Sequence, residues 1–387
     1  MIPANKPYFP LEDSEKITTA IHEILKSGIL TDGPWIDKFE KSFAEYIGCD
    51  YAIATNSGTS ALEILLRYYN VHGKEVIVPT NSFVASANAV IFAGGTPILT
   101  DISAKTLCID PQQIQKKISD ITVGVIAVHI AGLVCPEIDE MKKLCEQNNL
   151  FLIEDAAHAV GAQHHSKKAG NLCDGSAFSF YPTKVLTCGE GGMISTHNKE
   201  MAHFAKSLRC HGIGIHPQTG EKKKNRFTRL GHNWRMSEMQ AVVGFYQLKR
   251  LEDALAMRNT AASQYNRSLN ELEEVELIAT PPNDRNSYYK YPVILNSPHS
   301  RKNISDQLKE NYGIQCGSIY WPPIHLQPFY QDQFGYKEGD FENAENVLKR
   351  TISLPIYPEL TPTQIEQVVN ALKTVLKTNV QKPILME

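Results

Sequence analysis

Val123-Gly124-Val125-Ile126-Ala127-Val128 and Leu150-Phe151-Leu152-Ile153 are two apolar runs that decide the fold, and the helix-like segment Glu137–Gln147 separates them. Short runs rich in Val and Ile are typical of strands buried on both faces of a parallel sheet. The same rhythm occurs earlier in the chain, with strand-like runs at Tyr51–Ala54, Glu75–Val78 and Pro97–Thr100 and helix-like segments at Leu62–Tyr69, Val84–Phe92 and Pro111–Ile118. This alternation predicts an α/β fold whose mostly parallel sheet is sandwiched by helices.

The order of predicted elements changes in the second half of the chain. Ser176–Phe180 and Met193–Thr196 extend the sheet, and a long helical pattern then begins near Ser237 and continues past Arg258. It is followed by a strand, a helix and a final helix, at Tyr288–Leu295, at Ser300–Asn311 and from Thr363. We therefore predict a large domain over residues 1–250 and a smaller α/β domain over residues 251–387. Residues 212–225 lack apolar periodicity, so we predict a loop there.

The composition excludes several classes of protein. Of the 387 residues, 42% are hydrophobic and 21% are charged, as in a soluble globular protein. The net charge of −3 predicts no binding of nucleic acid, despite the basic run Lys222–Lys224. No apolar run approaches the roughly 20 residues of a membrane helix, and the amino-terminal residues lack the pattern of a signal peptide. The eight cysteines include no CxxC pair, so we predict no metal site and reduced thiols in a cytoplasmic protein.

Ligands of an open α/β sheet gather at the carboxyl ends of its strands, and residues 55–60 follow one such end. Backbone N–H groups at the start of the next helix favour an anion. Gly58 allows the backbone to approach a ligand closely, and Thr59 and Ser60 add hydroxyl donors. This pattern predicts a phosphate site, although Ser and Thr are also common helix caps. Phe83 follows the next strand, where an aromatic ring either stacks on a flat ligand or packs in the core.

Glu154-Asp155-Ala156-Ala157-His158 follows a third apolar strand. A carboxylate at a buried strand end needs a partner, and the N–H of a pyridinium ring is one such partner. Asp155 in that role would keep the ring protonated, which is the electron sink that pyridoxal 5′-phosphate (PLP) chemistry requires. The alternative is an acidic residue at the start of a helix.

Lys184 ends the run Ser179-Phe180-Tyr181-Pro182-Thr183-Lys184, and a glycine-rich stretch, residues 187–192, follows it. Most lysines are solvated surface charges. A lysine in a partly desolvated pocket instead has a lowered pKa and can act as an amine nucleophile and then as a general base. The sequence therefore predicts that Lys184 holds PLP as a Schiff base.

These blocks, in this order, resemble the DegT/DnrJ family of sugar aminotransferases, which have PLP fold type I, the fold of aspartate aminotransferase. The resemblance covers nearly the whole chain. It is carried by Ser27-Gly28, Thr31-Asp32-Gly33-Pro34, Asn56-Ser57-Gly58-Thr59, Glu154–His158, Phe178-Ser179-Phe180, Pro182-Thr183-Lys184, Gly189-Glu190-Gly191-Gly192, Leu208-Arg209, Gly231–Met236, His325 and Leu354-Pro355.

The resemblance implies a role for each matching residue. Lys184 and Asp155 would hold PLP as described above, and His158 would lie near the 3′-oxygen of the ring. Phe83 would stack on the ring, and the cofactor phosphate would contact Ser57, Gly58, Thr59 and Ser179. In this family the active site lies between two subunits, so we expect a homodimer in which Asn233 reaches the partner's cofactor. The chain departs from the family pattern beside Asn233, where His232 and Trp234 replace two tyrosines.

The implied activity is transfer of an amino group from an L-amino acid, glutamate by resemblance, to a keto-sugar, most commonly a nucleotide-linked one. The same chemistry on a keto-sugar phosphate, a PLP-dependent sugar dehydratase and a non-catalytic PLP-binding regulator are the alternatives. Lys184 favours transamination because the dehydratase branch carries His in its place. For the acceptor we predict contacts from Arg226 and Arg229, since guanidinium groups bind phosphate through two parallel hydrogen bonds.

The acceptor is also predicted to contact a proline-braced stretch near the carboxyl end, residues 320–325. By the resemblance, this stretch corresponds to the segment from which other members of the family place a histidine beside the sugar. His325 could donate to a sugar hydroxyl and Trp321 could stack on a sugar face. The alternative is a packed carboxy-terminal loop.

Overall fold

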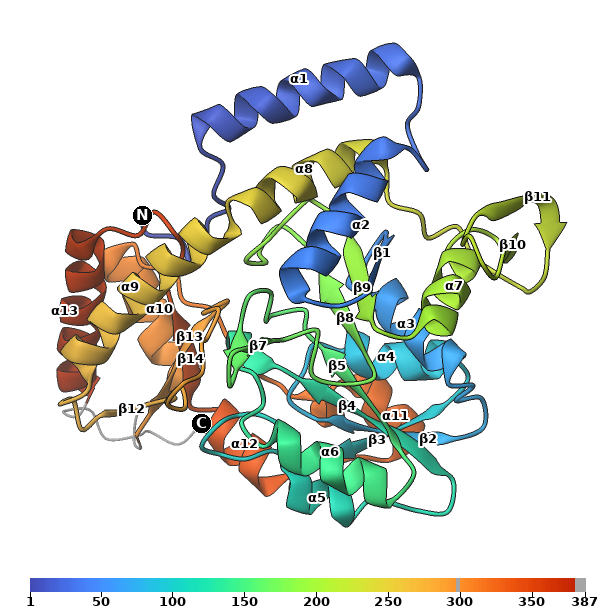
Figure 1. The fold of residues 1–387 in the computed structure, drawn as a ribbon. Coiled ribbons are helices and arrows are strands. Elements are labelled where there is room, and N and C mark those ends of the chain that lie inside the picture. Colours follow the sequence, from blue (N-terminus) through green and yellow to red (C-terminus); the bar gives the residue numbers. More distant parts are fainter. Residues whose placement is uncertain (297–299, 380–387) are drawn as a thin grey trace.

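A seven-stranded sheet lies at the centre of the computed structural model, which describes residues 1–296 and 300–379 (Figure 1). The strands lie in the order β1-β9-β8-β5-β4-β2-β3. Their bounds are Tyr51–Thr55 (β1), Glu75–Pro79 (β2), Thr96–Thr100 (β3), Thr122–Val128 (β4), Phe151–Asp155 (β5), Gly175–Ser179 (β8) and Gly192–Thr196 (β9). Only β9 runs against its neighbours, and the pairs from β8 to β3 are parallel. The predicted mostly parallel sheet is confirmed.

The strand directions bring the predicted site residues to one edge of the sheet. Because β9 is antiparallel to both β1 and β8, these two strands point the same way as β5, β4 and β2. The chain therefore leaves β1 just before Ser57, β5 at Asp155 and β8 at Ser179 on the same side. This is the edge where open α/β sheets bind ligands.

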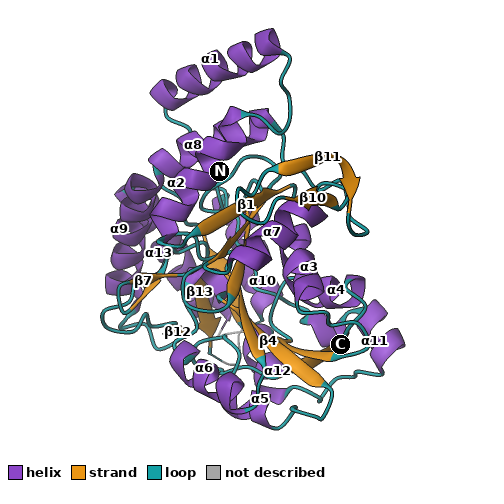
Figure 2. Ribbon diagram, turned by 45° about the vertical axis from the view of Figure 1, so that its right-hand side comes forward, coloured by secondary structure: helices purple, strands orange, loops and turns teal. Residues whose placement is uncertain are grey.

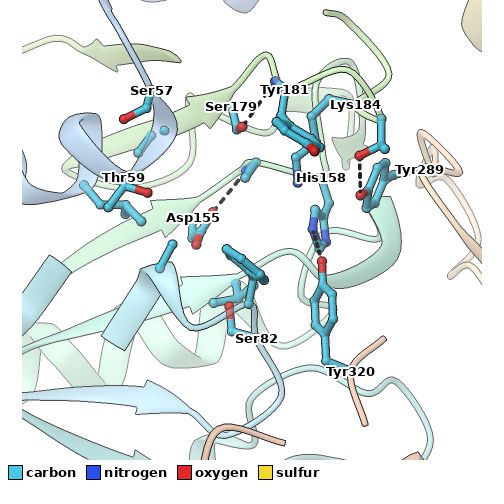
Figure 3. A pocket seen from close by; sticks show the side chains of 18 of the residues that line it. Ser57, Thr59, Ser82, Asp155, His158, Ser179, Tyr181, Lys184, Tyr289 and Tyr320 are labelled. Atoms are coloured by element: carbon cyan, nitrogen blue, oxygen red, sulfur yellow. Dashed lines mark hydrogen bonds between the residues drawn. The ribbon is translucent and has the colours of Figure 1, made fainter. Parts of the chain in front are cut away.

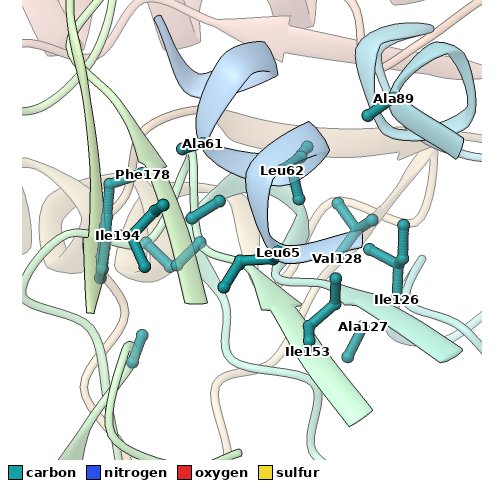
Figure 4. Close-up of a cluster of buried hydrophobic side chains, with 14 of the residues drawn as sticks. Ala61, Leu62, Leu65, Ala89, Ile126, Ala127, Val128, Ile153, Phe178 and Ile194 are labelled. Carbon is teal, nitrogen blue, oxygen red and sulfur yellow. The ribbon is translucent and has the colours of Figure 1, made fainter. Parts of the chain in front are cut away.

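Helices flank the sheet and bury its apolar side chains. Their bounds in the amino-terminal half are Leu11–Ser27 (α1), Pro34–Ile47 (α2), Gly58–Tyr68 (α3), Ala85–Phe92 (α4), Pro111–Gln115 (α5), Ile138–Gln147 (α6) and Lys199–Leu208 (α7). Helix α3 lies across β8 and β9, and Figure 4 shows its residues Leu62 and Leu65 beside Ile153, Phe178 and Ile194. Leu65 is fully buried, and burying one such side chain contributes about 1.5–3 kcal/mol. This packing fixes the start of α3 against the sheet.

The single long helix predicted from Ser237 past Arg258 is wrong, because the chain forms two helices there. Helix α8 spans Glu238–Lys249 and α9 spans Leu251–Leu269. Between them Arg250 caps the end of α8 and the start of α9, with φ −99° and ψ 0°, and its side chain binds Asp13 and Asp253 at 3.0 Å each. The two helices also pack on different neighbours, since α8 contacts α1 and α2 whereas α9 contacts α13.

The carboxy-terminal part contains a three-stranded antiparallel sheet, β12-β13-β14. Its elements are Val275–Leu277 (β12), Tyr291–Leu295 (β13), Arg301–Tyr312 (α10), Ile324–Leu326 (a 3₁₀ turn), Pro328–Phe334 (α11), Glu342–Leu348 (α12), Thr351–Leu354 (β14) and Pro362–Asn379 (α13). Side chains of α9, α10, α13 and this sheet form a second buried hydrophobic cluster, whereas α11 and α12 pack against the first. The boundary near Leu251 stays a prediction.

The loop predicted over residues 212–225 is also wrong, because part of it forms a hairpin with strands Ile213–Ile215 (β10) and Lys222–Phe227 (β11). Figures 1 and 2 show this hairpin beside α7, at the edge of the molecule. Strand β11 carries four basic residues in KKKNRF, so it has none of the polar–apolar alternation from which strands are predicted. A second, shorter hairpin joins Gln163–His164 (β6) to Lys167–Lys168 (β7), and Ile130–Gly132 forms a further 3₁₀ turn.

Across the described residues, 1–296 and 300–379, no helix is both long and apolar enough to cross a membrane.

Candidate active site

A cavity of about 480 Å³ opens at the carboxyl edge of the sheet (Figure 3). Such a volume is typical of a small-molecule or cofactor site. The cavity is lined by Ser57, Gly58, Thr59, Leu62, Ser82, Phe83, Ala85, Val128, Asp155, Ala157, His158, Ala177, Ser179, Tyr181, Thr183, Lys184, Glu190, Tyr289 and Tyr320. Eight of the predicted site residues therefore surround one space, although they come from four separate stretches of the chain.

The start of helix α3 forms one end of the cavity. Ser57 caps the helix, because its Oγ accepts a hydrogen bond of 3.1 Å from the Ser60 N–H. Thr59 and Ser179 place further hydroxyl groups at the same end (Figure 3). A Cβ atom on Gly58 would lie 2.8 Å from the Cβ of Ser179, so only glycine allows α3 to begin this close to β8. The helix cap and the predicted anion site are thus the same feature, since unpaired N–H groups of a helix start attract an anion.

Asp155 is the last residue of β5 and is 6% exposed. Its Oδ2 accepts a hydrogen bond of 2.6 Å from the Ser86 hydroxyl, and its Oδ1 accepts one of 3.1 Å from the Ala157 N–H. These bonds hold the carboxylate toward the middle of the cavity (Figure 3). A buried carboxylate with only neutral donors around it favours a positively charged partner.

Lys184 lies on the opposite side of the cavity from α3 (Figure 3). Its Nζ is 4.6 Å from the centre of the Tyr289 ring, and the Tyr289 hydroxyl is 3.0 Å from the Thr183 hydroxyl. Burial lowers the pKa of Lys184 to about 8, although the nearby Asp155 carboxylate works in the other direction. Near neutral pH a useful fraction of the amine is therefore unprotonated and nucleophilic.

His158 is 6% exposed and lies between two tyrosines. Its ring stacks on Tyr289 at 4.3 Å, and its Nε2 is 3.0 Å from the Tyr320 hydroxyl. Burial, reinforced by Lys184, lowers the pKa of His158 well below its ordinary value, so the ring is neutral near pH 7. Its Nδ1 is buried and has no hydrogen-bond partner among the residues that the structure describes. Such an atom is costly unless a ligand supplies the partner.

Four further residues of this site were missed by sequence reasoning. Tyr289 and Tyr320 line the cavity, and Ser82 and Ser86 link its floor to Asp155, with 2.6 Å between their hydroxyls. Tyr289 precedes strand β13, where it resembled an ordinary core residue. Tyr320 begins the stretch predicted to contact the acceptor, so that stretch does reach the cavity, through a different side chain. Phe83 lies at the cavity wall with its side chain 59% exposed.

Five predicted residues lie outside this cavity, and Arg226, Arg229 and Asn233 are three of them. Arg226 and Arg229 line a separate cavity of about 530 Å³ next to the β10–β11 hairpin, and the Arg229 guanidinium lies 4.6 Å from the Phe204 ring. Asn233 is exposed and pairs through its backbone with Cys210. Within one chain, therefore, none of the three contributes to the pocket around Lys184.

The structure does not bring His325 or Trp321 to the cavity. His325 is fully buried, with Nδ1 2.7 Å from the Thr80 hydroxyl and Nε2 3.0 Å from the Glu345 carboxylate. A histidine with both ring nitrogens occupied has none left for a sugar hydroxyl. Trp321 is partly buried and packs against the main hydrophobic cluster. We therefore correct the predicted substrate contact of His325, which holds the 3₁₀ turn against β2 instead.

The cavity fits PLP group by group. The start of helix α3, a carboxylate, an unpartnered imidazole nitrogen and an amine of lowered pKa face one space. The helix start would hold the phosphate of PLP, the carboxylate its ring nitrogen, the imidazole its ring oxygen and the amine its aldehyde. When bound, PLP supplies an electron sink for the carbon that carries the substrate nitrogen.

Comparison with known proteins agrees with this geometry. The model of the DegT/DnrJ/EryC1/StrS aminotransferase family matches residues 11–373. The chain belongs to this family. It is 35% identical to a GDP-perosamine synthase of Caulobacter vibrioides over 89% of this chain and 91% of that protein.

Two solved structures extend the comparison. The structure superposes with a TM-score of 0.89 on PseC of Helicobacter pylori, an aminotransferase of pseudoaminic acid biosynthesis (28% identity, 97% of this chain and 99% of that chain). With NtdA of Bacillus subtilis, solved with bound cofactor PMP, the TM-score is 0.87 (30% identity, 97% of this chain and 86% of that chain). The predicted family, PLP fold type I, the cofactor and the enzyme class, a PLP-dependent sugar aminotransferase, are therefore confirmed.

Proposed function

We propose that this enzyme transfers the amino group of an L-amino acid, glutamate, to the carbonyl carbon of a nucleotide-linked keto-hexose. The donor takes up an oxygen from water and leaves as its 2-oxo acid, and the acceptor takes the nitrogen and releases its carbonyl oxygen as water. The observation that carries the proposal is the pairing of Lys184 and Asp155 across one cavity in a chain similar to a GDP-perosamine synthase.

Five residues at or beside the cavity have a defined task in this proposal. The Lys184 Nζ would capture PLP and would then move a proton between the substrate carbon and the cofactor carbon. Asp155 would keep the ring nitrogen protonated, and Ser86 holds the Asp155 carboxylate. His158 would face the 3′-oxygen of the ring, and Tyr320 holds His158 through its Nε2.

The two half-reactions can be separated to test the acceptor. The enzyme is first converted with glutamate to its amino form, and the amino acid is removed. Keto-hexoses linked to UDP, dTDP or GDP, the matching sugar phosphates, and simple 2-oxo acids other than 2-oxoglutarate are then offered. We expect a nucleotide-linked sugar to restore the absorbance of the Lys184-bound cofactor. Restoration by simple 2-oxo acids alone would contradict the proposal, and release of an oxo-sugar without nitrogen would indicate a dehydratase.

We also infer that two copies form a homodimer in which each hairpin serves its partner's site. Asn233, Arg226 and Arg229 carry this inference, because all three lie outside their own chain's cavity around Lys184. The β10–β11 hairpin projects away from the body of the molecule (Figure 1), as a segment that reaches a partner must. The two arginines would then bind the phosphate charge of the acceptor.

Mixing two inactive variants tests the dimer. Lys184→Ala and Asn233→Ala chains are unfolded and refolded together, and we expect activity to return. If Asn233 acts in the partner's site, one site of a mixed dimer contains both substitutions and the other site contains neither, so the second site is active. Each variant refolded alone is the control. No recovery in samples shown to contain mixed dimers would mean that Asn233 acts within its own chain.

A further inference from the structure

A cluster of two histidines and one aspartate lies outside the active site, where the β6–β7 hairpin meets the start of helix α6. His164 ends β6, His165 follows it in the turn, and Asp139 lies in the first turn of α6. One ligand atom from each of the three residues lies within 4.8 Å of the other two. The chemistry proposed above makes no use of these residues.

The spacing of the three ligand atoms suits a shared ion better than direct hydrogen bonds. His164 Nε2 lies 3.6 Å from Asp139 Oδ2, and His165 Nδ1 lies 4.0 Å from the same oxygen. Both distances are too long for a hydrogen bond. Two ligands of one tetrahedral ion, each about 2.0–2.2 Å from it, lie about 3.4 Å apart. The two histidine rings stack with their centroids 4.0 Å apart, so the exposed side chains of His165 and Asp139 must rotate to bring all three atoms onto one metal.

A buried carboxylate prepares His164 as a ligand. Asp284 is 1% exposed at its side chain, and its Oδ2 lies 2.8 Å from His164 Nδ1. The carboxylate accepts the Nδ1–H, so the lone pair of the neutral ring is on Nε2, the atom that faces Asp139. Asp284 Oδ1 also accepts a 3.1 Å bond from the His165 N–H, which fixes the turn. A carboxylate behind a ligating histidine is the usual support of a metal site.

We propose that Asp139, His164 and His165 bind one divalent transition-metal ion, with Asp284 as the supporting carboxylate. Two imidazoles and one carboxylate suit Zn²⁺ and the neighbouring first-row ions and do not suit Mg²⁺. Asp139 and His165 are exposed, so the ion has an open path and keeps a water ligand. The ion would join α6, the β6–β7 hairpin and the segment around Asp284, three parts of the chain that are distant in sequence.

Zn²⁺ titration of the cofactor-bound enzyme by calorimetry, with Mg²⁺ in parallel, tests this site. We expect one Zn²⁺ per chain, no heat from Mg²⁺, and at least about tenfold weaker Zn²⁺ binding in Asp139→Asn and in His165→Asn. Asparagine is chosen at residue 165 because φ is +46° there, a conformation that asparagine tolerates. The matched control is His197→Ala, which removes a different exposed histidine paired with an aspartate, Asp50, and should leave Zn²⁺ binding unchanged.

A second measurement separates this site from other zinc-binding groups. Zn²⁺ should raise the melting temperature of the wild type and of His197→Ala, because an ion that binds only the folded state stabilises it. The rise should disappear in His165→Asn. Absence of stoichiometric Zn²⁺ binding to the wild type, or equal binding and equal stabilisation in both site variants, would overturn the proposal.

Discussion

Replacing Lys184 with alanine is expected to abolish turnover and to remove the visible absorbance of the bound cofactor. The amine is the only group of the cavity proposed both to capture PLP and to move the substrate proton, and general base catalysis alone contributes about 10²–10⁴-fold. A fall in kcat of at least about 10³-fold is therefore expected. Steady-state kinetics and the absorbance spectrum of the purified variant measure both effects.

Two controls show that the loss comes from the amine of Lys184. Lys184→Arg keeps the positive charge but has no amine to form the Schiff base, so it should be as inactive as alanine. Lys309→Ala removes an exposed lysine of α10, far along the chain, and should behave as the wild type. Borohydride reduction of the wild type should fix the cofactor to the peptide that contains Lys184. Label on any other lysine, Lys290 included, would make this assignment wrong.

The parts of the site that were predictable share one property: they lie at the end of a strand or within a few residues after it. Strand ends are visible in the sequence because buried parallel strands are apolar and short, and parallel strands place their ends at one edge. Asp155 and Ser179 belong to this group, and Ser57 follows two residues after β1. For such residues, the local sequence pattern is enough to predict that the residue lies at the carboxyl edge of the sheet.

The residues that were missed or misplaced depend on contacts between distant segments. Tyr289 and Tyr320 come from the second half of the chain, and no local pattern indicates which side of each segment faces the cavity. His325 is the opposite case, because the stretch that contains it does reach the cavity, but through Tyr320. Its ring turns toward Thr80 and Glu345, partners that lie 245 and 20 residues away. Orientation of this kind is set by packing, and the sequence pattern has no signal for it.

Hairpins posed the same difficulty on a smaller scale. Strand β11 is polar except for its last residue, Phe227, and is held mainly by backbone pairing with β10, so side-chain periodicity does not reveal it. The break at Arg250 was hidden for a related reason. Its ion pair with Asp13 joins residues 237 positions apart, whereas the helical pattern on either side is continuous.

Replacing Asp155 with asparagine is expected to leave a folded enzyme that binds PLP but turns over about 10²–10³-fold more slowly. The amide has nearly the shape of the carboxylate: its oxygen can still accept the hydrogen bond of the Ala157 N–H, and its NH2 group can donate to the Ser86 hydroxyl, which now bonds the carboxylate. What it lacks is the negative charge that keeps the ring nitrogen of bound PLP protonated. The loss should therefore appear in kcat, while cofactor content and melting temperature change little.

An N1-methylated PLP separates this electronic role from a structural one. Its ring carries a fixed positive charge, so it needs no carboxylate to stay charged. Loaded into Asp155→Asn, it should recover a large part of the lost rate, whereas in the wild type the methyl group should crowd the buried Asp155 and lower the rate. Ser86→Ala, which removes only the 2.6 Å support of Asp155 Oδ2, should cost less than Asp155→Asn and should not respond to the methylated cofactor. Near-normal turnover of Asp155→Asn with ordinary PLP would show that the charge of Asp155 is not needed. If the methylated cofactor restored the rate of Ser86→Ala as fully as that of Asp155→Asn, the recovery would be due to positioning of the ring and not to its charge.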